Sequence, residues 1–66
     1  MKYNIGDIVF LKQSKVYAYI LRIENDLLGV NWYTLKLQTG QTFGSSIVHY
    51  IRFNKEQMMF YVEKVP

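Results

Sequence analysis

The alternation of apolar and polar positions is clearest between Asn31 and Gln38. One set of side chains is Asn31, Tyr33, Leu35 and Leu37, and the set between them is Val30, Trp32, Thr34, Lys36 and Gln38. This period of two, in residues that favour a pleated surface, predicts a strand with one buried and one partly solvated face. The Thr39-Gly40 pair that follows predicts a tight turn, after which residues 41–43 pair back briefly.

Four further runs predict strands. Residues 8–12 form a compact apolar run, and residues 16–24 begin apolar on both sides and end amphipathic, which is typical of a strand that bends at a barrel corner. Residues 47–53 alternate, and their β-branched and aromatic side chains favour a strand, although the serines before them could also cap a helical turn. The polar residues 54–57 predict a turn or one turn of 3₁₀ helix, and residues 58–65 predict the last strand.

Five short strands without a long helix predict an all-β fold, with residues 1–66 as a single domain. A sheet of this size avoids exposed edges most simply by curling into a small, strongly bent barrel that stays partly open. Such a barrel is expected to have a core but little cavity. A chain this short also buries only about 60% of the surface that its unfolded form exposes, so a partner would help its stability.

Composition and charge narrow the classes of function. The chain is 50% hydrophobic and 17% aromatic, which favours a folded domain over disorder. The absence of cysteine excludes disulfides, thiolate metal sites and a thiol nucleophile. The net charge of +3 is compatible with phosphate backbones but is equally common in proteins that never meet nucleic acid. Because no apolar run is long enough for a membrane span and no signal peptide is recognisable, we expect a cytoplasmic protein without a membrane partner.

The polar residues predict no reaction. His49 is the only histidine, so no second imidazole can join it in a metal site or a proton relay. Asp7 and Asp26 are expected to be turn residues, and Gly44-Ser45-Ser46 does not match the elbow of a serine hydrolase. Phosphate-binding glycine motifs are absent. We therefore expect a non-enzyme that uses no cofactor, metal or small-molecule substrate.

The high content of aromatic side chains suggests a binding surface. Tyr17 and Tyr19 lie two positions apart, and Trp32 lies on the partly solvated face of the next strand. If these two strands pair, the rings form a platform with cationic edges, unless the tyrosines belong mainly to the core. The predicted binding surface is Trp32, Tyr17, Tyr19, Arg22, Lys36 and Gln38.

Two kinds of partner suit this surface. Trp, Tyr and Arg are favoured anchors of protein interfaces, and a second copy of the chain is one such partner. Alternatively, the rings could stack on bases of RNA or single-stranded DNA, worth about 1–3 kcal/mol per base, while the cations meet phosphates. The modest charge and the scattered lysines favour a protein partner.

The order of motifs resembles the small SH3-like barrels, which include bacterial SH3-type, KOW, Tudor-like and chromo-like modules. The resemblance rests on Gly6-Asp7-Ile8-Val9-Phe10-Leu11 at the first strand and on Tyr33-Thr34-Leu35-Lys36-Leu37-Gln38-Thr39-Gly40 at the third. The diglycine of many KOW segments and the A-L-Y-D-Y run of eukaryotic SH3 domains are missing. In size the chain is similar to small accessory proteins of bacteriophages. The resemblance implies a five-stranded barrel and, because one fold serves many functions, no particular activity.

Overall fold

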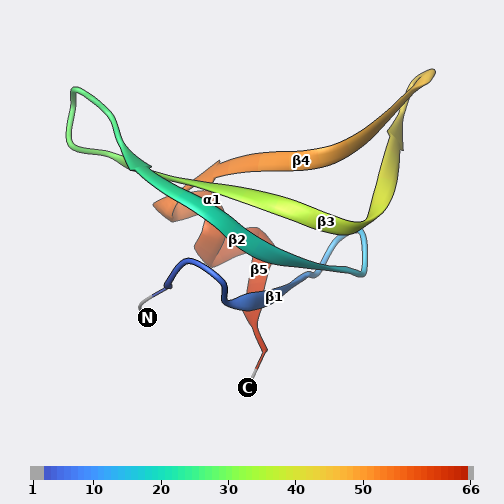
Figure 1. The fold of residues 1–66 in the computed structure, drawn as a ribbon, viewed down its shortest axis with the longest axis horizontal. Helices are drawn as coiled ribbons and strands as arrows, with labels where there is room; N and C mark the ends of the chain where they lie inside the picture. The colour runs from blue at the N-terminus through green and yellow to red at the C-terminus, as the bar shows by residue number, and fades with distance from the viewer. Residues whose placement is uncertain (1–2, 66) are drawn as a thin grey trace.

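Five antiparallel strands and one short helix make up residues 3–65, the part that the computed structural model describes; the side chains of Gln41 and Phe43 lie outside that description. The elements are β1 (Ile8–Leu11), β2 (Val16–Asn25), β3 (Asn31–Phe43), β4 (Ser46–Asn54), α1 (Lys55–Tyr61) and β5 (Val62–Lys64). The strand order is β4-β3-β2-β1-β5, so the first and last strands are neighbours (Figure 1). The predicted all-β class is confirmed.

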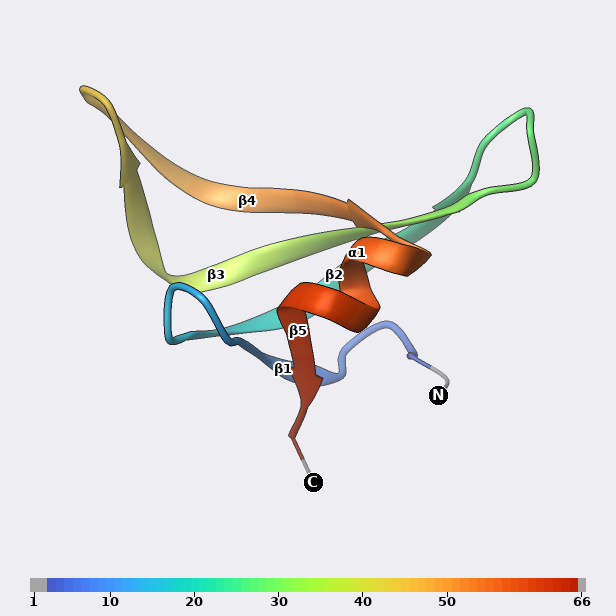
Figure 2. The ribbon, with the colours of Figure 1, turned by 180° about the vertical axis from the view of Figure 1, so that it is seen from behind.

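The sheet bends strongly but does not close into a barrel. β4 and β5 form its two edges, and α1 connects them across the concave face (Figure 2). Within the described residues the sheet is therefore open, and the curling that the sequence predicts does not complete a barrel. The physical reason lies in the connection between the edges, since a helix that contacts β3, β4 and β5 occupies the space where the edges would otherwise meet.

Helix α1 replaces the first half of the predicted last strand. Asn54 caps it: its side chain accepts a hydrogen bond from the Gln57 backbone N–H, and the Gln57 side chain accepts one from the Asn54 N–H, both at 2.9 Å. This capping box satisfies two N–H groups that a helix start otherwise leaves unpaired. The helical turn predicted at residues 54–57 thus continues to Tyr61, and the strand prediction is wrong for residues 58–61 because Met58 packs into the core from the helix.

The core lies on the concave face, between the sheet and α1. Its buried side chains are Val9, Leu11, Ala18, Ile20, Tyr33, Leu35, Leu37, Met58 and Val62. The buried residues of β3 are those that the alternation assigned to its inner face. In β2 the register shifts between Ile20 and Arg22, so that Ile23 pairs with Tyr33 and packs against the core. This bulge produces the bend that the pattern of β2 predicts.

β3 continues through the position where the sequence predicts a turn. Gly40 lies inside β3, residues 41–43 belong to the same strand, and the turn to β4 follows at Gly44, whose φ is 63°. The predicted turn at Thr39-Gly40 is therefore wrong. Gly40 serves close approach instead, because a Cβ there would lie 2.6 Å from Ile47 Cγ2 and 2.9 Å from His49 Cε1.

Candidate binding surface

The strand register places the predicted binding residues on the outer face of the sheet, opposite α1 (Figures 1 and 2). Side chains on this face form rows across neighbouring strands. The rows are Phe10 and Tyr17; Ile8, Tyr19, Lys36 and Tyr50; Arg22, Thr34 and Arg52; and Glu24, Trp32 and Asn54. Five of the six predicted residues therefore share one surface, which we call the outer face.

The two tyrosines lie on the surface and outside the core. Tyr17 is 49% exposed, and its ring packs against Phe10 with centroids 5.0 Å apart. Tyr19 is partly exposed, and Arg22 and Lys36 are exposed. The sixth predicted residue, Gln38, is exposed but follows the last paired row, where β3 begins its bend. It lies beside the outer face and outside its rows.

Trp32 is held by two neighbours. Its indole Nε1 donates a hydrogen bond to Asp26 Oδ2 at 2.9 Å, and the Arg52 guanidinium carbon lies 4.8 Å from the ring centroid. A guanidinium at this distance attracts the negative face of the ring. Trp32 is consequently an ordered, half-buried part of the surface whose ring already has a cation against it.

Asp26 organises the turn between β2 and β3. Its Oδ1 accepts hydrogen bonds from the backbone N–H groups of Leu28 and Val30 at 2.8 and 2.9 Å, while Oδ2 accepts from Trp32. The Trp32 hydrogen bond, followed by the Val30 N–H bond, lowers the pKa of the Asp26 carboxyl because both favour its ionised form. The expected turn role of Asp26 is confirmed, and one carboxylate links the turn to the outer face.

Sequence reasoning missed the contribution of β4. Tyr50 is 52% exposed and lies in the row of Tyr19 and Lys36, and Arg52 lies in the row of Arg22. Their alternation within residues 47–53 was visible in the sequence. The turn predicted at Thr39-Gly40 set the wrong register between β3 and β4, so these side chains could not be placed beside Lys36 and Thr34.

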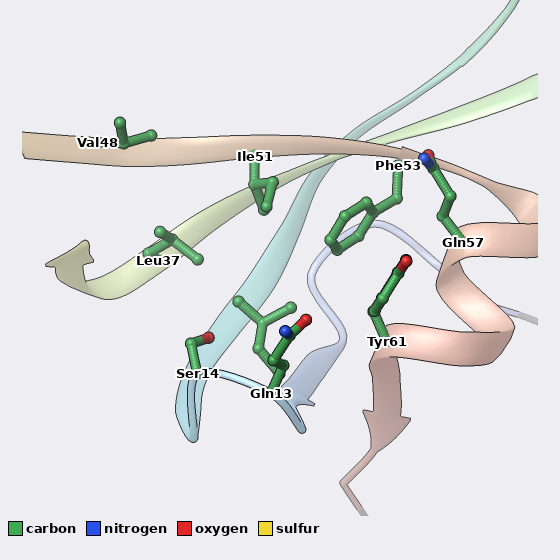
Figure 3. Close-up of a pocket in the computed structure, with 9 residues that line it drawn as sticks. Gln13, Ser14, Leu37, Val48, Ile51, Phe53, Gln57 and Tyr61 are labelled. Atoms are coloured by element: carbon green, nitrogen blue, oxygen red, sulfur yellow. The ribbon is translucent and has the colours of Figure 1, made fainter. Parts of the chain in front are cut away.

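The concave side contains an apolar groove, which the sequence did not predict. It has a volume of about 620 Å³ and lies between β4, the β1–β2 loop and α1 (Figure 3). Its lining is Leu11, Gln13, Ser14, Leu37, Val48, Ile51, Phe53, Gln57 and Tyr61. The expectation of little cavity is therefore wrong, and the reason is that the edges of the sheet stay apart and leave the groove between them.

The remaining polar side chains contribute locally. Asp7 accepts a hydrogen bond from the Asn4 N–H at 2.9 Å, as expected of a turn residue, and lies 3.5 Å from Lys64 Nζ. His49 is an exposed residue of β4. Within residues 3–65, no three His, Asp or Glu side chains gather closely enough to hold a metal ion. No helix in that range is long and apolar enough to cross a membrane.

Comparison with known proteins gave no relative. No protein-family model matches this chain, and neither the curated proteins nor the solved structures yield a match. The function is therefore argued from the two surfaces described above.

Proposed function

We propose that this chain is a non-catalytic, SH3-like binding domain that recognises another protein through its outer face. Five antiparallel strands, the neighbouring first and last strands, and a helical segment before the last strand support the SH3-like part of the proposal. Such a domain acts by presenting a surface, so the proposal depends on the chemistry of the outer face.

The observation that carries the proposal is the arrangement of cations among aromatic rings on neighbouring rows. Lys36 lies between Tyr19 and Tyr50 in one row, and the next row brings Arg22 and Arg52 to either side of Thr34. Tyrosine and arginine are enriched in the energetically important centres of protein interfaces. The matching partner is a peptide segment that carries both aromatic and acidic side chains.

The position of Trp32 favours a protein over a nucleic acid. Arg52 lies against its ring, and the indole N–H is bonded to Asp26, so a base that stacks on that face would first have to displace the guanidinium. Glu24 pairs with Trp32 across β2 and β3, which adds a negative charge to the same row. A phosphate backbone would be repelled there, whereas a protein partner can avoid it or pair with it.

Peptide display tests the proposal directly. Random peptides are selected on the wild-type domain, and their affinities are measured for a double variant, Tyr17→Ser with Tyr50→Ser. We expect aromatic, acidic peptides whose affinity falls at least about tenfold in the double variant, because exposed tyrosine anchors of an interface contribute 1 kcal/mol or more. Met59→Ser with Phe60→Ser is the matched control, since these residues are 69% and 74% exposed on α1. Selected peptides that bind the Tyr17/Tyr50 variant as tightly as the wild type would refute the proposal.

Single-stranded nucleic acid is a second candidate, favoured by the three cations Arg22, Lys36 and Arg52 in adjacent rows. It predicts that mixed oligonucleotides quench Trp32 fluorescence, with an affinity that falls steeply as salt rises. For three neutralised phosphates, the slope of log K against log salt is about −2. An unchanged Trp32 signal at low salt would remove this candidate and leave the protein partner.

A further inference from the structure

The tip of the β2–β3 hairpin displays two leucines to solvent. Leu27 is fully exposed and Leu28 is 88% exposed, the two highest values among the exposed large hydrophobic residues of the described chain. The hairpin tip projects beyond the body of the sheet in both views (Figures 1 and 2). Adjacent apolar side chains on a projecting turn are typical of a contact site.

The tip is ordered by hydrogen bonds. Asp26 accepts the N–H groups of Leu28 and Val30 through its side chain, and its backbone N–H donates to the Val30 carbonyl at 3.0 Å. Gly29, at φ 81°, donates its N–H to the Asp26 carbonyl at 3.0 Å. A turn that is already ordered loses little conformational entropy when it binds. The leucines are therefore presented as a preformed apolar projection.

The groove on the concave face offers an apolar recess of matching character. Ile51 and Phe53 extend from β4 into the groove, where the Phe53 ring stacks on Tyr61 with centroids 5.5 Å apart (Figure 3). Its volume of about 620 Å³ is within the usual range of ligand pockets, about 300–1,000 Å³. The recess is large enough to receive apolar side chains of a partner.

The charges carried by the two loops themselves are opposite, although Arg52 from β4 lies against Trp32 at the base of the hairpin. The hairpin end at residues 24–31 contains Glu24 and Asp26 and no lysine or arginine. In the β1–β2 loop, Lys12 and Lys15 stand on either side of the two groove residues Gln13 and Ser14, and both lysines are exposed. Opposite charges around an apolar contact select the partner and fix its orientation.

We propose that the Leu27-Leu28 tip of one copy inserts into the concave groove of a second copy. A chain does not fill its own groove, because the tip projects away from the body of the sheet (Figures 1 and 2) and the β1–β2 loop lies at the other end of β2. The contact joins two different surfaces, so it is head-to-tail and extends into short rows of copies. Its apolar contacts, Leu27 and Leu28 in the groove, use no residue of the outer-face rows, so the contact can fail or hold independently of the proposed function.

The small size of this contact predicts weak, concentration-dependent assembly. Two leucines in a groove bury much less than the roughly 1,200–2,000 Å² of a stable interface, so dissociation constants in the micromolar to millimolar range are expected. Sedimentation velocity of the wild-type protein should therefore show a mass that rises over this concentration range. A wild-type protein that remains monomeric at millimolar concentration would overturn the proposal.

Mixing two variants tests the head-to-tail geometry. Leu27→Asp with Leu28→Asp removes the tip, and Val48→Asp places a charge in the groove at the edge strand β4. Each variant alone should sediment as a monomer, whereas their equimolar mixture should form a species of two chains and no larger one. In that pair, one intact tip meets one intact groove, and the other two sites are defective. A mixture that contains only monomers would refute the contact.

Controls separate this contact from loss of folding and from other apolar binding. Far-ultraviolet circular dichroism checks the fold of each variant, and Lys12→Glu with Lys15→Glu provides a second groove variant without a change inside the groove. Met59→Asp with Phe60→Asp, the exposed apolar pair of α1, should leave assembly unchanged, and a loss of assembly in this variant would contradict the proposal. A tip variant that assembles normally but no longer binds phosphatidylcholine vesicles would also contradict it, because the tip would then bind a lipid surface.

Discussion

The two long hairpins share strand β3 but are shaped by different physical effects. At the β2–β3 end, one extra residue in β2 produces a single bulge, and the Asp26 side chain ties the turn together. At the β3–β4 end, residues 37–40 of β3 stand opposite His49 alone, and the tip bends away from the sheet (Figure 1). Specific hydrogen bonds therefore define one hairpin, and the missing side chain of a glycine permits the other.

The two hairpins are expected to differ in how easily they open, although both contain β3. A turn with its N–H groups bonded to a carboxylate resists local opening, whereas a hairpin with an interrupted register has fewer paired backbone groups to hold it. We accordingly expect hydrogen exchange to be slower at Leu28 and Val30 than at Ser45 and Ser46.

Among substitutions in the two hairpins, Gly40→Ala is expected to change the free energy of unfolding most. The new Cβ would meet Ile47 Cγ2 at 2.6 Å and His49 Cε1 at 2.9 Å, and the overpacking should lower the free energy of unfolding by about 1–3 kcal/mol. Urea denaturation measures the change. Hydrogen exchange should show faster opening at the β3–β4 tip and little change at Asp26.

A second substitution tests whether crowding is the cause. Ile47 is 67% exposed, so Ile47→Ala alone should cost little stability, yet in combination with Gly40→Ala it should restore part of the loss. Simple addition of the two effects would mean that Ile47 does not cause the strain.

A smaller effect is expected at the other hairpin when Asp26 is protonated. Its pKa is lowered in the folded protein, chiefly by the Trp32 N–H, so the stability that its ionised form contributes is present above its unfolded pKa and is lost as the pH falls through the lower folded pKa. The unfolded value is about 3.9, so Trp32 fluorescence should change only below about pH 4.

Asp26→Asn is the control for this titration. The amide keeps the shape of the carboxyl but does not titrate in this range, so the acid-induced change in Trp32 fluorescence should disappear. An identical titration in Asp26→Asn and in the wild type would show that another group controls the signal.

The smallest effect is expected from Arg52→Ala. Removal of the guanidinium from the Trp32 ring should cost about 0.5–1 kcal/mol, the usual range of an exposed cation–π pair, and should increase the solvent exposure of the indole. Arg22→Ala, on the same outer face, is the matched control because Thr34 separates the two arginines across the row. Equal shifts of Trp32 emission in both variants would argue against a specific contact with Arg52.

Local alternation predicted the faces of the strands well. Tyr33, Leu35 and Leu37 are buried and Lys36 and Gln38 are exposed, as the pattern of β3 indicated, and the doubly apolar start of β2 corresponded to a real bend. These features depend on positions within one strand, where alternate residues point to opposite faces, so a period of two in the sequence shows them directly.

Features that depend on longer-range packing were predicted less well. The Thr39-Gly40 pair is typical of a turn, so a turn was predicted there. In the structure, the missing side chain of Gly40 instead leaves room for the side chains of Ile47 and His49. Met58 occurs in a run of apolar residues that favours a strand, whereas the capping box of Asn54 and Gln57 starts a helix that brings this side chain into the core. The Asn-x-x-Gln spacing was the signal in the sequence that could have revealed this helix.

The groove follows from that same helix and could not have been derived from the strands alone. Tyr61 and Gln57 line it from α1, Ile51 and Phe53 line it from β4, and the rings of Phe53 and Tyr61 stack with centroids 5.5 Å apart. A strand over residues 58–61 would have placed these side chains differently. Because residues 58–61 were predicted as a strand, the groove could not be predicted from the sequence.

The pairing of β1 with β5 has a consequence for the order of folding. Val9 pairs with Lys64 and Leu11 with Val62, so this contact joins residues from nearly opposite ends of the described chain. Closing so long a loop costs more entropy than forming either hairpin, and a seven-residue helix gains little stability before it packs. The β2–β3–β4 meander is thus expected to form first, with α1 and β5 docking last. During synthesis, residues 62–64 must leave the ribosomal exit tunnel before the sheet acquires its fifth strand.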